Sequence, residues 1–240
     1  MENGIYIGIS RQAALRRQMD VVANNLANVN TPAYRAERMV FQEFLMKPPQ
    51  DQTGYSYVQD IGQYRSTENG PITATGNELD VALNGEGYFV VDTPLGERYT
   101  RHGRFQLDAN GFVVTTEGHQ VLSDAGPIQI PPQSTSIEIN GDGSISTDVA
   151  TLGKLQVVQF EDDQEPKRGA NGLYTTEQDP QVATDVQIVQ GSLEQSNVVA
   201  VLEITRMIEI SNAHNSLRKI LENEDERNRT MIRRLGQSQS

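Results

Sequence analysis

The stretch Met207-Ile-Glu-Ile-Ser-Asn-Ala-His-Asn-Ser-Leu-Arg-Lys-Ile-Leu221 sets the pattern of the C-terminal region. Apolar residues recur there at alternating steps of three and four, which is the spacing of one narrow helix seam. The pattern predicts a helix from Val198 to about Leu235, begun by Ser196 or Asn197 as a cap. The full seam runs through Met207, Ile210, His214, Leu217, Leu221, Glu224, Asn228, Met231 and Leu235.

A second seam lies at the N-terminus and predicts another amphipathic helix. The helix should stop at Thr31-Pro32, because proline disfavours helical geometry in the residue before it. Arg11, Arg16 and Arg17 lie on the face away from the seam. The seam itself runs through Ile5, Gly8, Gln12, Leu15, Met19, Val22, Leu26 and Val29.

Between the two helices the apolar period changes from about 3.6 to 2, which indicates short strands. Asn-Gly and Pro-Leu-Gly turns separate these strands, as in an antiparallel β domain, which we place at residues 80–190. Residues 48–79 are rich in Pro, Gln, Thr, Gly and Tyr and favour an extended connector. The expected strands are 80–83, 87–91, 105–107, 111–114, 137–140, 144–146 and 155–160.

The fold class expected from these periods is α+β, in four segments. They are an N-terminal axial helix with its following segment (1–47), the connector (48–79), the β domain (80–190) and a C-terminal axial helix (191–240). The two helices would pair in the manner of a coiled coil. Periodicity alone leaves two arrangements open, a monomer whose helices pack on its own β domain or an assembly in which other copies cover the seams.

Charge is distributed unevenly along the 240 residues, whose formal net charge is −12. Residues 48–197 carry 22 acidic and 7 basic side chains, a net of −15, while the two ends together carry 10 and 13, a net of +3. Such an acidic chain is a poor partner for nucleic acid. The asymmetry fits a solvated body with less charged, apolar-striped ends, although any acidic protein has a solvated acidic face.

The chain has no cysteine, which rules out disulfides, thiol chemistry and cysteine-bound zinc. No stretch approaches 18 apolar residues, so we expect no membrane insertion. Residues 1–19 lack the basic-then-apolar region of a cleaved signal peptide, so export, if it occurs, would use uncleaved termini.

No catalytic constellation is predicted, and we expect no cofactor, metal or small-molecule substrate. His102, His119 and His214 share no short metal-ligand spacing. The loop 140–144 lacks the downstream glutamate of a calcium loop, so it predicts a hairpin turn. The acidic residues around 161–165 fit a solvated loop.

Four blocks resemble those of the flagellar rod and hook axial proteins, in the family's order. They are Asn24-Asn-Leu-Ala-Asn-Val-Asn-Thr-Pro-Ala-Tyr-Arg35, Thr75-Gly-Asn-Glu-Leu-Asp-Val-Ala-Leu-Asn-Gly-Glu-Gly-Tyr-Phe89, Tyr99-Thr-Arg-His-Gly-Arg-Phe105 and Gly191-Ser-Leu-Glu-Gln-Ser-Asn-Val198. The ending Thr31-Pro-Ala-Tyr-Arg35 is similar to that of proximal-rod members, with the distal-rod member as the alternative.

The resemblance implies a structural subunit of the bacterial flagellar basal-body rod, a torque-transmitting drive shaft that spans the periplasm. It implies export through the flagellar type III apparatus without a cleaved signal, and partners that are further copies and other rod proteins. The terminal helices would form the inner tube of a helical assembly and the β domain its outer layer. Two other classes of protein are alternatives, a secreted adhesin-like β module on a helical stalk and a hydrolase with an acidic cleft.

On this reading the seams supply the contacts between subunits. Asn25 and Asn28 either cap backbone groups or fix register between subunits, and both alternatives stay open. The expected interface residues are Leu15, Met19, Val22, Asn25, Leu26, Asn28, Val29, Met207, Ile210, Leu217, Leu221, Met231 and Leu235.

Overall fold

The structure is a computed structural model, and it describes residues 2–46 and 55–237. The described chain forms two compact units. The helical unit combines the described parts of 1–27, 37–66 and 199–240, and the β unit combines 28–36 and 67–198. The chain therefore passes from one unit to the other four times. This division differs from the four consecutive segments expected from the sequence.

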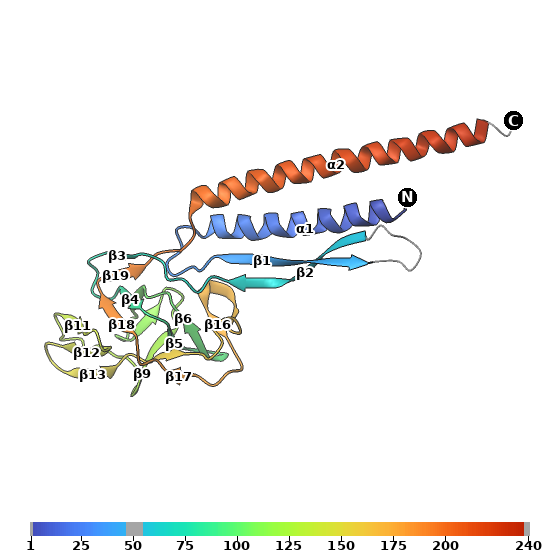
Figure 1. The fold of residues 1–240 in the computed structure, drawn as a ribbon. Helices are drawn as coiled ribbons and strands as arrows, with labels where there is room; N and C mark the ends of the chain where they lie inside the picture. The colour runs from blue at the N-terminus through green and yellow to red at the C-terminus, as the bar shows by residue number, and fades with distance from the viewer. Residues whose placement is uncertain (1, 47–54, 238–240) are drawn as a thin grey trace. The chain divides into compact units, whose positions relative to one another are not determined.

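The helical unit holds both long helices and a β hairpin (Figure 1). Helix α1 spans Glu2–Ala27 and helix α2 spans Ala200–Gln237. Strands β1 (Glu37–Met46) and β2 (Tyr55–Arg65) pair antiparallel. Helix α1 runs alongside both α2 and the hairpin (Figure 1).

Helix α2 begins two residues later than its sequence pattern predicts. The predicted capping residues, Ser196 and Asn197, make other hydrogen bonds instead. The carbonyl of Val199 accepts the amides of Leu202 and Glu203, so Val199 is the residue that opens the helix. The Asn197 side chain instead accepts the amide of Ala36 at 2.7 Å. The hydroxyl of Ser196 accepts the amide of Val198 before the helix starts. Both residues organise the segment that leads into α2.

The hairpin falls partly in residues 48–79, where the sequence predicts an extended connector. A bulge explains why the strand pattern was missed. Val40 faces Gly62 in the register, but Phe41 faces Asp60, so Ile61 is an extra residue. One extra residue reverses which face the following side chains occupy, which breaks the period of two along β2.

Within the β unit every described strand pair is antiparallel, as the sequence predicts. The largest sheet runs in the order β15-β16-β6-β5-β9-β8-β7, with β10, β14 and β17 attached to it. Small sheets β11-β12-β13, β18-β4 and β19-β3 complete the unit. The strands are β3 (Ile72–Ala74), β4 (Val81–Asn84), β5 (Tyr88–Thr93), β6 (Gly96–Thr100), β7 (Phe105–Leu107), β8 (Val113–Thr115), β9 (Gln120–Ser123), β10 (Gly126–Pro127), β11 (Ile137–Ile139), β12 (Ser144–Thr147), β13 (Thr151–Lys154), β14 (Val157–Gln159), β15 (Lys167–Arg168), β16 (Tyr174–Thr175), β17 (Gln181–Val182), β18 (Gln187–Gln190) and β19 (Ser192–Glu194), with a 3-10 turn at Ala170–Gly172.

Strand β5 is the centre of this unit because both of its faces are buried. Successive side chains point to opposite faces of a strand, so Phe89 and Val91 enter one core and Tyr88 and Val90 another. The first core is mainly aliphatic, and Phe89 meets Phe105 edge-on at 5.2 Å between ring centroids. The second is aromatic, with Tyr88 packed against Phe160 and Tyr174. The four-residue apolar run in the sequence reflects this double burial.

A substitution at Gly103 tests how tightly the β unit is packed. A Cβ added there would lie 1.6 Å from the carbonyl oxygen of Val81, which is backbone and cannot swing aside. We expect Gly103→Ala to lower the free energy of unfolding of the β unit by about 3 kcal/mol or more, as for severe overpacking. Urea unfolding followed by aromatic fluorescence measures this.

The matched control is Gly141→Ala, where the added Cβ meets nothing closer than 3.6 Å. We expect that variant to stay within about 1 kcal/mol of the parent chain. Equal stability of the two variants would contradict the packing described for Gly103.

Candidate assembly surface

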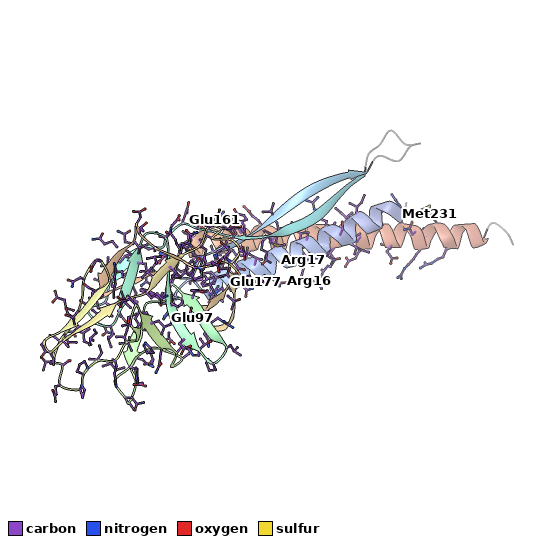
Figure 2. All side chains as sticks on the ribbon, turned by 90° about the horizontal axis from the view of Figure 1, so that it is seen from below. Arg16, Arg17, Glu97, Glu161, Glu177 and Met231 are labelled. Atoms are coloured by element: carbon purple, nitrogen blue, oxygen red, sulfur yellow. The ribbon has the colours of Figure 1, made fainter. Side chains whose placement is uncertain are left out.

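The expected seam of α1 faces the interior of the helical unit. Leu15 and Val22 are buried, and Met19 and Leu26 are half-buried. On the opposite side Arg16 and Arg17 are exposed and project from the helix (Figure 2). The amphipathic pattern of the sequence therefore corresponds to an inward and an outward face.

Three contacts show that α1 and α2 pair antiparallel. Gly8 of α1 lies against Leu221, whose Cδ2 would be 2.6 Å from a Cβ at position 8. One turn along, the Gln12 amide nitrogen lies 3.4 Å from Nε2 of His214. Asn25 and Glu203 meet near the other end of the pair. As the α1 number rises, the α2 number falls, and between Gly8 and Asn25 helix α1 advances by 17 residues while α2 goes back by 18, so the helices run side by side along much of α1.

The α2 side of this pairing uses the predicted seam positions. Met207, Ile210, Leu217 and Leu221 are half-buried. Met231 is 36% exposed and lies towards the C-terminal end of α2 (Figure 2). Leu235 belongs to α2, but its side chain lies outside the described residues. Much of the seam surface is therefore covered within one chain.

Asn25 is the polar centre of the helical unit and is only 1% exposed. Its Oδ1 accepts the amide of Glu37 at 2.9 Å, and its Nδ2 donates to the Glu37 carbonyl at 2.8 Å. The same Nδ2 group donates to Oε2 of buried Glu203 at 3.2 Å, and Glu203 also pairs with Arg206. One side chain thus joins α1, the start of β1 and α2. The structure uses this amide inside the chain.

Asn28 and Val29 lie in the β unit and not on the seam. The Asn28 carbonyl accepts the amide of Thr31, and its Oδ1 accepts the Thr31 hydroxyl at 3.1 Å. Val29 packs against a small cluster that contains Tyr34 and Val198. Both residues therefore stabilise the turn that follows α1.

A hollow of about 500 Å³ opens within the helical unit. Its apolar lining includes Leu15, Val22, Ile210 and Ala213, and its polar lining includes Glu203. The complete lining is Leu15, Gln18, Val21, Val22, Asn25, Glu37, Arg38, Met39, Tyr64, Glu203, Arg206, Glu209, Ile210 and Ala213. The space is large enough for an incoming apolar side chain.

The face of α2 opposite its seam is apolar and exposed, which sequence reasoning did not predict. Val201 is 71% exposed, Ile204 45% and Ile208 56%. Their spacing of three and four places them on one side of the helix. Leu202 is also exposed nearby. A search of residues 198–210 for apolar positions on more than one face would have found this exposed stripe, defined as Val201, Ile204 and Ile208.

The described residues show no grouping that could hold a metal ion. Burial lowers the pKa of His102 below its ordinary value, so this imidazole is largely neutral at physiological pH. Neither helix, over its described residues, is long and apolar enough to cross a bilayer.

Comparison with known proteins gives a consistent result along the chain. The family described as "Flagella basal body rod protein" matches residues 5–35. The "Flagellar hook protein FlgE/F/G D1 domain" matches 82–147, and the "Flagellar basal body rod FlgEFG protein C-terminal" matches 189–234. The flagellar basal-body rod protein FlgF of Caulobacter vibrioides is 41% identical over 98% of this chain and 99% of its own length.

The chain belongs to the flagellar basal-body rod protein family. FlgF of Mesorhizobium japonicum is 35% identical over 89% of each chain, and FlgG of Bacillus subtilis is 32% identical over 94% of this chain and 96% of its own. The protein is a structural subunit of the rod and not an enzyme. This family membership sets aside the adhesin-like and hydrolytic alternatives.

Asn25 offers a direct test of the helical unit in this rod protein. Asn25→Ala removes the bonds to Glu37 and leaves buried Glu203 without its amide donor. Losing buried hydrogen bonds of this kind destabilises by about 1–3 kcal/mol. We expect amide exchange in α1 to accelerate by a matching factor of about 10 to 100.

Hydrogen exchange with mass spectrometry measures that change, and Asp20→Ala at an exposed position of the same helix is the control. Unaltered protection of α1 in Asn25→Ala would show that this amide does not hold the helices together.

Proposed function

We propose that the rod subunit polymerises through α2, whose exposed stripe is covered by a second copy of this chain. The single observation that carries this proposal is the exposed apolar stripe on α2. The side of α2 that meets Asn25 of α1 holds Glu203, while Val201, Ile204 and Ile208 on another side are exposed. A contiguous exposed apolar surface of this kind marks a contact with another chain.

The proposed receiving surface is the hollow of the helical unit in the neighbouring copy. The hollow and the stripe are different surfaces of one unit, so the contact would be head-to-tail. A head-to-tail contact whose rotation does not close produces an open helical filament instead of a ring. The shape of a rod follows from this type of contact without a further component.

The magnitudes explain how a subunit could stay single when dilute and still assemble. Burying three Val or Ile side chains contributes roughly 5 to 9 kcal/mol in total. Association of two proteins costs an estimated 4–15 kcal/mol or more in lost translational and rotational freedom and side-chain ordering. One such contact therefore does little by itself. A subunit held by several neighbours at once would be stable, which favours growth at an existing rod end.

The expected seam residues have a second proposed role in the assembly. Leu15, Met19, Val22, Leu26, Met207, Ile210, Leu217 and Leu221 would bind the two helices in a coiled-coil-like pair that presents the stripe. In the rod, Met231 and Leu235 would contribute contacts towards the C-terminal end of α2, and Asn28 and Val29 would contribute from the β unit. Buried Asn25 would support the interface from inside the helical unit. The terminal segments 1–47 and 191–240 would act as the axial part, with the connector 48–79 leading to the β domain 80–190.

The proposal extends to the position of this subunit within the rod, its partners and its location. A proximal-rod position is supported by the higher identity to FlgF of Caulobacter vibrioides and of Mesorhizobium japonicum than to FlgG of Bacillus subtilis, and the distal rod is the alternative. The partners would be further copies, other rod proteins and the flagellar type III export apparatus. The rod would span the periplasm, and the subunit would reach it without a cleaved signal peptide.

Charged substitutions on the stripe test the proposed contact. Ile204→Asp and Ile208→Asp place a carboxylate on an exposed surface, so the isolated chain should fold normally. In the rod the same carboxylate would be buried without a partner, which is strongly unfavourable. We expect complemented deletion cells to lose swimming and to show truncated basal bodies in electron micrographs.

Asn215→Asp is the matched control, because Asn215 lies on the same line of α2, further along and exposed. Swimming should persist in this control. Normal rods in both Ile204→Asp and Ile208→Asp cells would rule out the stripe as a subunit contact.

Filling the hollow tests the receiving side separately. Ala213 lines it, and Ala213→Phe would occupy space proposed for a neighbour's side chain. We expect circular dichroism of the purified variant to match the parent, while motility is lost as in the stripe variants. If Ala213→Phe cells swim normally while Ile208→Asp cells do not, the stripe binds elsewhere and the head-to-tail pairing is wrong.

A further inference from the structure

Three segments of the β unit lie next to three of the four points where the chain passes between the units. They are 33–36, 67–71 and 194–198, called here the linking segments. Their backbones bond to one another directly. The amide of Ala33 donates to the Glu194 carbonyl at 2.8 Å, and the amide of Gln195 donates to the Pro71 carbonyl at 2.9 Å. The linking segments are therefore one connected group within the β unit.

The contact between two of these segments leaves no room for a side chain. A Cβ at Gly70 would lie 1.8 Å from the carbonyl oxygen of Gln195. Asn197, which belongs to segment 194–198, bonds to both of the other segments. Its Oδ1 accepts the amide of Ala36 at 2.7 Å, and its Nδ2 donates to the Glu68 carbonyl at 2.8 Å. One amide side chain holds all three linking segments together.

Arg101 joins this group to the strands of the β unit, and its side chain is only 1% exposed. Its Nε donates to Oε2 of Glu194 at 2.9 Å, and its Nη1 donates to the Gly87 carbonyl at 2.8 Å. Its Nη2 donates to the Gly85 carbonyl at 3.0 Å and to Oδ1 of Asn69 at 3.2 Å. The other Glu194 oxygen accepts the amide of Gly70 at 3.0 Å.

Arg35 makes a second connection of the same kind and is 2% exposed. Its Nη1 pairs with Oδ2 of Asp163 at 2.6 Å, and its Nη2 donates to Oδ1 of Asn69 at 3.0 Å. Asp163 in turn accepts the hydroxyl of Tyr88 from central strand β5. The linking segments are thus tied to the middle of the sheet at two places.

Stability alone does not account for this arrangement. A buried ion pair is often no more stabilising than a well-packed apolar group, because both charges lose their hydration. Burial lowers the pKa of Arg101, and the Glu194 carboxylate opposes that shift. A guanidinium nevertheless stays charged, and its planar set of donors fixes several acceptors in defined directions. Such a group specifies geometry.

All four sequence blocks quoted above contribute residues to this network. Only the first block, which contains Asn25, also contributes to the proposed contacts of the helical unit. Arg35 comes from the first block, Gly85 and Gly87 from the second, Arg101 from the third, and Glu194 with Asn197 from the fourth. Blocks spread over most of the chain meet in one place. This convergence calls for a role other than covering α2.

We propose that Arg101 and Glu194 are positioning residues for the rod, which lock the linking segments so that torque reaches the β unit without loosening them. A load on the helical unit reaches the β unit through four covalent connections. One of them, at Asn28, continues along the chain into segment 33–36, and the other three are carried by the linking segments directly. Were they free to move separately, torque would first distort them. The proposal requires the chain to be a rod subunit but does not depend on the stripe contact of α2.

The test compares two variants of the network, Glu194→Gln and the milder Arg101→Lys, with a control variant, Glu97→Gln. Glu97 is exposed and is labelled in Figure 2. Glutamine keeps the shape but weakens the charged bonds, and lysine keeps the charge but loses the planar donors. In purified full-length chain, we expect amide exchange at 33–36, 67–71 and 194–198 to rise about tenfold or more, with β5 protection unchanged.

In complemented cells we expect both variants to build basal bodies of normal length. Swimming should then fall several-fold in viscous medium relative to dilute medium, a load dependence that Glu97→Gln cells should not show. An even rise of exchange across β5 and the linking segments would indicate a purely stabilising role and overturn the proposal. Unchanged exchange at the linking segments, or faster exchange with normal swimming under load, would also overturn it.

Discussion

The face of α2 that α1 does not cover is the constraint on which the rest of this account depends. A single helix partner can cover one side of another helix, and α1 covers the side with Met207, Ile210 and Leu221. Val201, Ile204 and Ile208 then remain on the opposite side in contact with water. Because apolar area removed from water is stabilising in proportion to its extent, this exposed surface favours contact with another chain. In a protein of the rod family, a neighbouring subunit is the natural source of that contact.

The two units have different physical roles. The helical unit presents surface for assembly and needs little beyond one register, which the Asn25 amide supplies by joining α1, β1 and α2. The β unit is closed around its own cores, with both faces of β5 covered. Three of its buried charged groups, Arg35, Arg101 and Glu194, lie in or against the segments where the chain enters and leaves. A stiff shaft needs both properties, because contacts between subunits carry load only as far as each subunit keeps its own shape.

Much of the fold could be predicted from the sequence, since the signals concerned are local. The period of the seams predicted both helices, although α1 ends at Ala27, four residues before the stop expected at Thr31. The expected strands 87–91 and 105–107 lie close to β5 and β7. The hairpin β1–β2 was missed because its bulge breaks the alternation, and the cap at α2 was misplaced because Asn197 has distant partners. The seam residues were found, but only the structure shows that many of them are covered by the chain itself, while the stripe opposite is bare.

Reactivity of one engineered cysteine tests the central claim most directly, because the chain contains no cysteine of its own. Ile208→Cys would be treated with a water-soluble maleimide, once as dilute purified subunit and once in isolated basal bodies, with Glu97→Cys as an exposed reference. The account predicts rapid labelling of position 208 in the dilute subunit and strong protection in the rod, while position 97 sets the scale in each sample. Equal labelling of position 208 in both states would contradict the account, because the stripe would then remain in water after assembly.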